Sequence, residues 1–141
     1  MIDNIESVKL GSVPYTIVRG HPVVSNEDDK VLWGEFLQGK QVIKVDSELK
    51  PEMQRVVLLH EIIHGLLMHC GLSDHLEEIP ERLGYALDAF LVDNPDFVKL
   101  YQETVSRSGL VSIDPEGHFT SDPNRWRVVG DGKKFGMVEN E

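Results

Sequence analysis

The first third of the chain consists of short apolar stretches separated by turn-forming residues, a pattern typical of strands. Tyr15-Thr16-Ile17-Val18 is rich in strand-favouring side chains. Further along, the apolar residues 31–36 and 41–45 are separated by Gln38-Gly39-Lys40, which has the spacing of a hairpin. We therefore expect a small antiparallel sheet in this part of the chain.

Apolar residues with helical spacing begin after the predicted sheet. Pro51 suits the first turn of a helix, and Gly71 offers a stop. The apolar positions between them are Val56, Val57, Leu59, Ile63, Leu66 and Leu67. This pattern predicts one long helix that ends near Gly71.

Two further helices are predicted after the first. One should run from about Asp74 to Val92, with an apolar face that packs on the first helix. The members of that face are Leu76, Leu83, Leu87, Phe90 and Leu91. Asn94 and Pro95 are typical of a helix break followed by a new start, and the third helix should end at Gly109.

Beyond residue 110 the sequence changes to clusters of turn-forming residues, with a possible hairpin around Gly130-Asp131-Gly132. We therefore divide the chain into a domain of residues 1–109 and a C-terminal extension of residues 110–141. The predicted fold class is α+β, in which a small antiparallel N-terminal sheet packs on a three-helix core and an irregular extension follows.

Composition narrows the class of protein. The 141 residues are 40% hydrophobic and 27% charged, which is typical of a globular protein rather than a disordered or membrane one. A formal net charge of -10 argues against direct binding of nucleic acid, so we interpret Arg125-Trp126-Arg127 as part of an exposed hairpin. The single cysteine, Cys70, and an N-terminus without a secretion signal favour a cytoplasmic location with no membrane association.

The candidate chemistry lies on the first predicted helix, at His60-Glu61-Ile62-Ile63-His64. Residues four apart on a helix lie about 40° apart around its axis, so His60 and His64 can both reach one metal ion. Glu61, beside the first histidine, can take a proton from a metal-bound water. This pattern predicts a zinc site that hydrolyses amide bonds.

A catalytic zinc site usually has three protein ligands, so one ligand must come from elsewhere in the chain. His69 lies about 140° around the helix axis from His64 and should point away, and Cys70 is a poor candidate. On the second helix, Glu77 is in phase with the apolar face. However, Asp74 and Glu77 also have the spacing of a capping box, so spacing alone leaves the Glu77 carboxylate open between metal ligand and helix cap.

The surrounding pattern resembles a known family. Its parts are Trp33-Gly34-Glu35, the helix motif Leu58-Leu59-His60-Glu61-Ile62-Ile63-His64-Gly65, and a helix that contains two adjacent glutamates and ends in Asp93-Asn94-Pro95. Together they are similar to the ImmA/IrrE-type zinc metallopeptidases, and most of all to minimal members encoded by phages and prophages. The resemblance covers less than half of the chain, and it implies a zincin-like core.

The resemblance also implies roles for individual residues. His60 and His64 would bind one Zn(II) ion, and Glu61 would be the general base. A glutamate at the start of the following helix would be the third ligand. Glu77 matches that position best, and Glu78 is the alternate; Pro80, early in that helix, departs from the family pattern.

The function expected from these residues is hydrolysis of peptide bonds, with a regulatory protein as the implied substrate. The alternative is a catalytically silent zinc-binding module of phage or prophage origin that recognises another protein through residues 111–141. Tyr85 is the nearest tyrosine to the site in sequence, so it is a candidate donor to the developing oxyanion or, alternatively, a surface aromatic. If neither glutamate binds the metal, His75 is the next candidate ligand.

Overall fold

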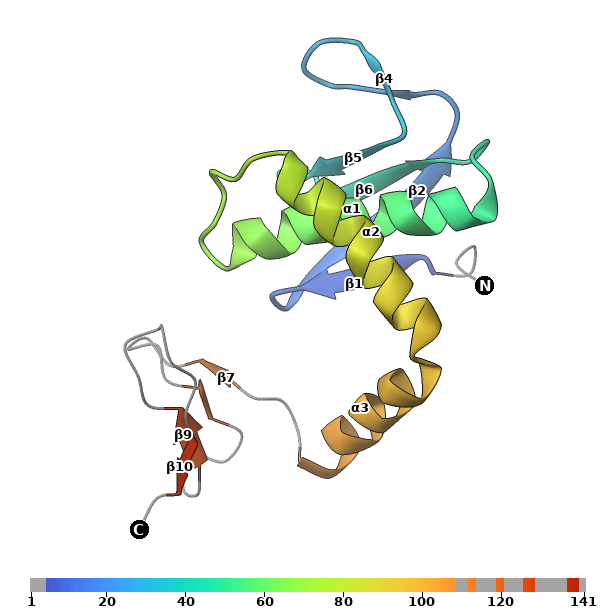
Figure 1. Cartoon of the computed structure of the whole chain (residues 1–141). Helices are drawn as coiled ribbons and strands as arrows, with labels where there is room; N and C mark the ends of the chain where they lie inside the picture. Colours follow the sequence, from blue (N-terminus) through green and yellow to red (C-terminus); the bar gives the residue numbers. More distant parts are fainter. Residues whose placement is uncertain (1–4, 109–111, 114–118, 121–125, 129–136, 140–141) are drawn as a thin grey trace. The chain divides into compact units, whose positions relative to one another are not determined.

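The computed structural model describes residues 5–108, 112–113, 119–120, 126–128 and 137–139, with side chains described for residues 5–104. It divides into two compact units, Met1–Asp93 and Asn94–Glu141. The first unit contains β1 (Ser7–Leu10), β2 (Val13–Gly20), β3 (Val23–Val24), β4 (Val31–Leu32), β5 (Gly34–Leu37), β6 (Val42–Asp46), α1 (Pro51–His69) and α2 (Glu78–Asp93). This is the α+β fold expected from the sequence (Figure 1).

The sheet of the first unit has four strands in the order β1-β2-β6-β5. The hairpin predicted between residues 31–36 and 41–45 is confirmed for β5, which pairs antiparallel with β6, whereas residues 31–32 form β4 and pair with β3. The expectation of a wholly antiparallel sheet is wrong, because β2 and β6 are parallel. Residues 21–41 form a connection long enough to bring the chain back to the starting end of β2, as a parallel pair requires.

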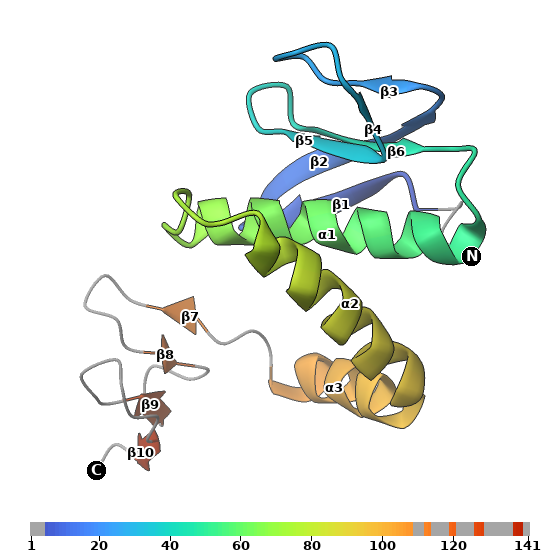
Figure 2. The ribbon, with the colours of Figure 1, turned by 45° about the horizontal axis from the view of Figure 1, so that its top comes forward.

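The core lies between this sheet and α1, which packs against β5 and β6 (Figure 2). Side chains alternate along the strands, so Tyr15 and Ile17 from β2 and Ile43 and Val45 from β6 are buried on one face. Val57 and Leu58 of α1 complete this cluster together with Leu10. The core therefore holds fixed the helix that carries both histidines.

The first helix agrees with its prediction. Pro51 is its first residue, and His69 is its last. Gly71 follows with a φ of +91°, a left-handed conformation that glycine adopts without steric cost. The N–H of Leu72 donates to the carbonyl oxygen of Leu67 at 2.8 Å, which caps the end of the helix.

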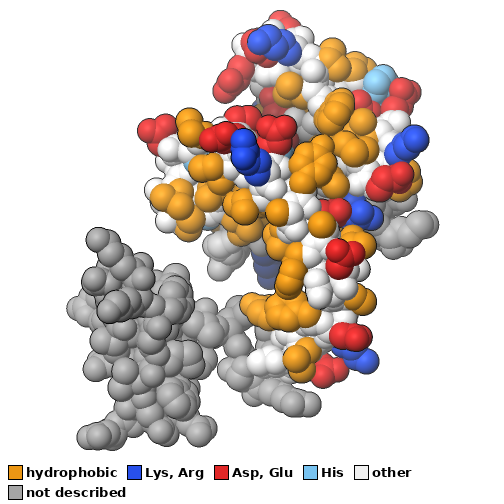
Figure 3. All heavy atoms as spheres, viewed as in Figure 1, with side chains coloured by type: hydrophobic (Ala, Val, Ile, Leu, Met, Phe, Trp, Pro, Cys, Tyr) orange, Lys and Arg blue, Asp and Glu red, His pale blue; other side chains and the backbone are white. Residues whose placement is uncertain are grey.

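The second helix begins at Glu78 rather than near Asp74 as predicted. Pro80 explains the difference, because proline has no N–H and is tolerated in the first turn but not in the interior of a helix. The predicted apolar face is also wrong in orientation: Leu83, for example, is 48% exposed, whereas Pro80 and Gly84 are the buried residues. Small residues let α2 cross α1 closely, and hydrophobic side chains gather at the surface over α2 (Figure 3).

The second unit contains α3 (Pro95–Ser108), β7 (Ser112–Ile113), β8 (Phe119–Thr120), β9 (Trp126–Val128) and β10 (Met137–Glu139). The break at Asn94 and the start at Pro95 are as predicted. β9 and β10 pair antiparallel, and the expected turn at Gly130-Asp131-Gly132 lies outside the described residues. The division expected between residues 109 and 110 stays a prediction. Within the described residues, no helix is both long and apolar enough to cross a membrane.

Gly65, the residue after the second histidine, should not tolerate a side chain. A Cβ atom there would overlap Leu10 Cδ1 and lie 2.8 Å from Phe36 Cε2. Alanine favours a helix by about 1 kcal/mol over glycine, but overpacking costs about 1–3 kcal/mol. We expect Gly65→Ala to lower the free energy of unfolding in urea by up to about 2 kcal/mol, the overpacking cost less the gain in helix propensity. Gly39→Ala is the control because no atom lies within 4 Å of its Cβ position, and equal effects of the two substitutions would contradict the prediction.

Candidate metal centre

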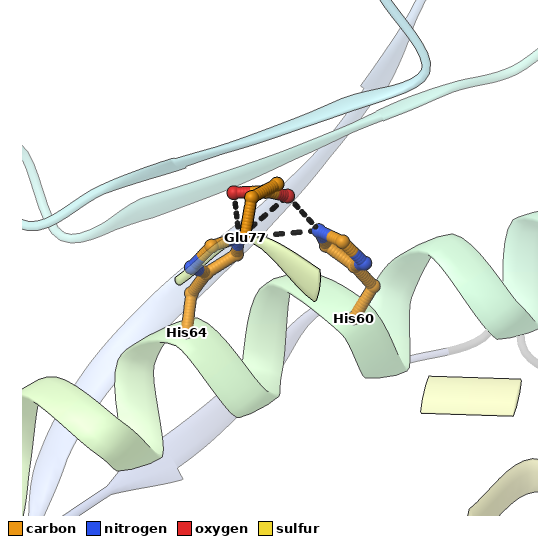
Figure 4. Close-up of side chains that lie close together, drawn as sticks. All are labelled: His60, His64 and Glu77. Atoms are coloured by element: carbon orange, nitrogen blue, oxygen red, sulfur yellow. Dashed lines mark hydrogen bonds and ion pairs between the residues drawn. The ribbon is translucent and has the colours of Figure 1, made fainter. Parts of the chain in front are cut away.

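Helix α1 brings His60 and His64 together, as their spacing predicts. Their Nε2 atoms are 3.1 Å apart, and both side chains are partly buried. The rings lie one helical turn apart and point toward the same place beside the helix (Figure 4). One metal ion can therefore contact both rings.

Glu77 completes the group from the loop just before α2. Its Oε1 atom lies 2.8 Å from His60 Nε2 and 3.2 Å from His64 Nε2. The ligand atoms of the three residues all lie within 4.8 Å of one another, so the group can hold a metal ion. Within the described residues, no other group of three or more potential ligands is this compact.

The same geometry excludes one of the two roles left open for Glu77, that of a helix cap. Because α2 begins at Glu78, Asp74 is not its N-cap and a capping box from Asp74 to Glu77 does not form. The Glu77 carboxylate, 69% exposed, contacts the histidines instead. Glu78 lies outside the group and has Arg82 Nη2 at 3.6 Å from its Oε2 atom.

Glu61 lies beside the histidines but is buried in the protein, with only 7% of its surface exposed. Burial raises the pKa of its carboxyl to about 8, and the negative charges of Glu77 and Glu35 add to the effect. A hydrogen bond from the backbone N–H of Phe36 opposes this shift in the pKa of Glu61. A cation bound nearby would favour the charged carboxylate and lower its pKa again.

Burial lowers the pKa of His64, whereas it raises that of Glu61. The reason is that imidazole is charged when protonated, and burial disfavours the charged form. Desolvation lowers the pKa of His64, although the nearby Glu77 carboxylate partly offsets this. His64 is therefore neutral at pH 7. A metal ligand must have an unprotonated nitrogen, so this shift prepares the ring for a cation.

Two hollows border the group and share Glu61 and Glu77 in their walls. The first has a volume of about 380 Å³ and is lined mainly by apolar side chains, including Trp33, Met53 and Tyr85. The second has a volume of about 540 Å³, and its additional carboxylates come from Glu27, Asp28 and Glu35. Both hollows are within the size range of ligand pockets, so the group is accessible from two sides.

The remaining candidates from the sequence do not belong to the ligand group. The Nε2 atom of His69 is 2.9 Å from the hydroxyl oxygen of Tyr15, so His69 points away as predicted. Cys70 is an exposed free thiol beyond the end of α1. Tyr85 lines the first hollow, and its side chain is 52% exposed.

His75 has a contact that its place in the sequence does not predict. It lies next to His64 rather than in the ligand group, with its Nε2 atom 2.8 Å from His64 Nδ1. Its own Nδ1 atom is 2.6 Å from the carbonyl oxygen of Leu72. Nothing in the spacing indicates this contact, because it depends on the course of the loop between α1 and α2.

Comparison of the chain with protein-family models, with curated proteins and with solved structures finds no match. The resemblance to a peptidase family therefore rests on the motifs in the sequence. The metal-binding capacity rests separately on the geometry of His60, His64 and Glu77.

Proposed function

We propose that this chain is a zinc-dependent metallopeptidase that hydrolyses peptide bonds with Glu61 as the general base. The observation that carries the proposal is the convergence of His60, His64 and Glu77 beside a buried glutamate. Two histidines and one glutamate are a recurrent ligand set of catalytic zinc, which leaves one coordination position for water or substrate.

The distances in the group fit zinc. Ligand atoms at about 2.0–2.2 Å from a tetrahedral zinc ion lie about 3.3–3.6 Å from one another. The separations here are 3.1 Å between the two histidine nitrogens, and 2.8 and 3.2 Å from these to Glu77 Oε1. A bound ion would have to spread the three atoms by about 0.1–0.8 Å.

In the proposed reaction, the metal and Glu61 have separate roles. A zinc ion held by His60, His64 and Glu77 would supply polarisation of the substrate carbonyl and a lower pKa for its water. Glu61 accepts the proton from the attacking water and then gives it to the amine that leaves. Because burial and the nearby carboxylates of Glu77 and Glu35 raise the pKa of Glu61, the residue can hold that proton between the two steps.

The alternative is a silent module that binds zinc but does not catalyse hydrolysis. Two observations favour the enzyme. A purely structural zinc site needs no buried base. In this chain Glu61 is buried beside the histidines, although burying a carboxyl costs free energy. The two hollows beside the ligands give room for the chain of a peptide on either side of the scissile bond.

The resemblance to ImmA/IrrE-type metallopeptidases supports the same reaction and a regulatory protein as substrate. With a single cysteine in the sequence, the proposal includes a reducing, cytoplasmic location. It includes no nucleic acid as ligand, because the net charge is -10.

The proposal is tested by metal analysis and cleavage assays on the full chain purified without added zinc. We expect about one zinc per chain, and cleavage of a mixed peptide library that is lost with a chelator and restored by zinc. A protein that neither contains nor takes up zinc would overturn the proposal. Stoichiometric zinc without cleavage of any peptide or protein tested would instead favour the silent module.

A further inference from the structure

The loop between α1 and α2 carries a histidine that is bound on both sides. His75 Nδ1 lies 2.6 Å from the carbonyl oxygen of Leu72 within the loop, and His75 Nε2 lies 2.8 Å from Nδ1 of His64 on α1. The other nitrogen of His64 faces His60 and Glu77. His75 therefore touches a ligand of the candidate metal centre without belonging to the ligand group.

These contacts fit one placement of the protons. A carbonyl oxygen only accepts hydrogen bonds, so His75 must carry a proton on Nδ1, and a ring with one proton then has its lone pair on Nε2. That lone pair accepts the Nδ1–H of His64. Neutral His64 then has no proton on Nε2, and its free electron pair faces the place where a cation would lie.

The rest of the group agrees with this assignment. With His64 Nε2 unprotonated, the Nε2–H of His60 is the donor to Glu77 Oε1, across the shortest separation in the group at 2.8 Å. The separation between His64 Nε2 and Glu77 Oε1 is longer, 3.2 Å, as expected for two atoms that both lack a proton. One set of protons thus gives each of the three shortest contacts a donor and an acceptor.

The same histidine also holds the segment that delivers the third ligand. Glu77 follows His75 by two residues and precedes the first residue of α2. The bond to His64 ties this loop to α1, and the bond to Leu72 closes it on itself. A loop that is already fixed loses less conformational entropy when Glu77 binds a metal, so binding is stronger.

We propose that His75 is a positioning residue of the metal centre: it fixes His64 with the proton on Nδ1 and holds the loop that places Glu77. This inference rests on the proposed function, because it takes zinc to be the metal that the site binds. Histidine ligands generally donate their second N–H to a carboxylate, a carbonyl or water, and loss of such a partner typically weakens binding about 10–100-fold. In this chain the partner is a second imidazole.

Zinc affinity, measured by competition with a chromophoric chelator, tests the proposal in the full chain. We expect His75→Ala to weaken zinc binding about 10–100-fold. His75→Gln should stay within about threefold of the parent, because its amide oxygen can accept the same hydrogen bond. The control is His21→Ala, which removes a partly exposed imidazole whose partner is Asp46, away from the metal centre.

A second measurement determines which ring nitrogen of His64 carries the proton. In the metal-free protein, ¹⁵N NMR of the histidine rings should show His64 protonated on Nδ1 in the parent and in His75→Gln, and a mixture of the two tautomers in His75→Ala. Unchanged zinc affinity in His75→Ala, equal loss in the alanine and glutamine variants, or a parent His64 protonated on Nε2 would each overturn the proposal. If the parent binds no zinc, the proposed function fails, while the NMR spectra still decide the role of His75.

Discussion

Glu61→Gln is expected to lower the rate of peptide hydrolysis by roughly 100- to 10,000-fold, the range of a lost general base, with zinc still bound. The amide has nearly the same shape as the carboxyl but cannot accept the proton. Glu61 is not one of the three residues whose ligand atoms converge, so zinc content should remain that of the parent. Cleavage rate and zinc content should be measured on the same sample, and an unchanged rate would show that Glu61 is not the base.

The same variant offers a control for damage to the fold, because it should be more stable than the parent when metal is absent. The pKa of Glu61 is about 8 in the folded protein against 4.5 for an ordinary glutamate, so between these pH values the folded state holds a proton that the unfolded chain releases. The free energy of unfolding of the parent therefore falls as the pH rises through this window. Urea unfolding with a chelator present should show Glu61→Gln more stable at pH 8 by a few kcal/mol, with little difference at pH 4. Equal pH dependence of the two proteins would contradict the burial of this carboxyl.

Glu77→Ala is expected to weaken zinc binding by at least about 100-fold, more than the loss of a residue that only supports a ligand. The Glu77 carboxylate is the only oxygen ligand in the described group, and both histidine nitrogens face it. The substitution should cost little stability, because the side chain is 69% exposed. Zinc affinity by chelator competition and urea unfolding of the metal-free protein measure the two effects.

The neighbouring glutamates supply matched controls for this prediction. Glu78 lies beside Arg82, and Glu81 lines the first hollow without belonging to the ligand group. We expect Glu78→Ala and Glu81→Ala to bind zinc as the parent does. If Glu78→Ala loses zinc while Glu77→Ala retains it, the third ligand is the alternate residue, and the loop takes another course when metal is bound.

The residues of the candidate site come from two parts of the fold. The sheet and α1 form a core that fixes His60 and His64, whereas Glu77 comes from an exposed loop. The core side of the site thus holds both histidines and Glu61, the proposed base. The third ligand depends on contacts of the loop, which is why His75 matters for metal affinity in our proposal.

The sequence by itself determined the features that depend on local periodicity. Proline at the start, apolar positions at helical intervals and glycine after the end defined α1. The helical repeat then placed His60 and His64 on one side of α1 and turned His69 away. The β5–β6 hairpin followed in the same way from two apolar stretches and a short polar turn.

Only the tertiary structure decided the features that depend on contacts between separate segments. Strand alternation shows which side chains are buried but not the direction of a neighbour, so the parallel pairing of β2 with β6 was missed. The late start of α2 could have been inferred from Pro80, but not the course of the loop before it. That loop brings Glu77 and His75 to α1, and packing under the sheet buries Glu61. These contacts join residues of different segments, and helical or strand periodicity describes only residues within one segment.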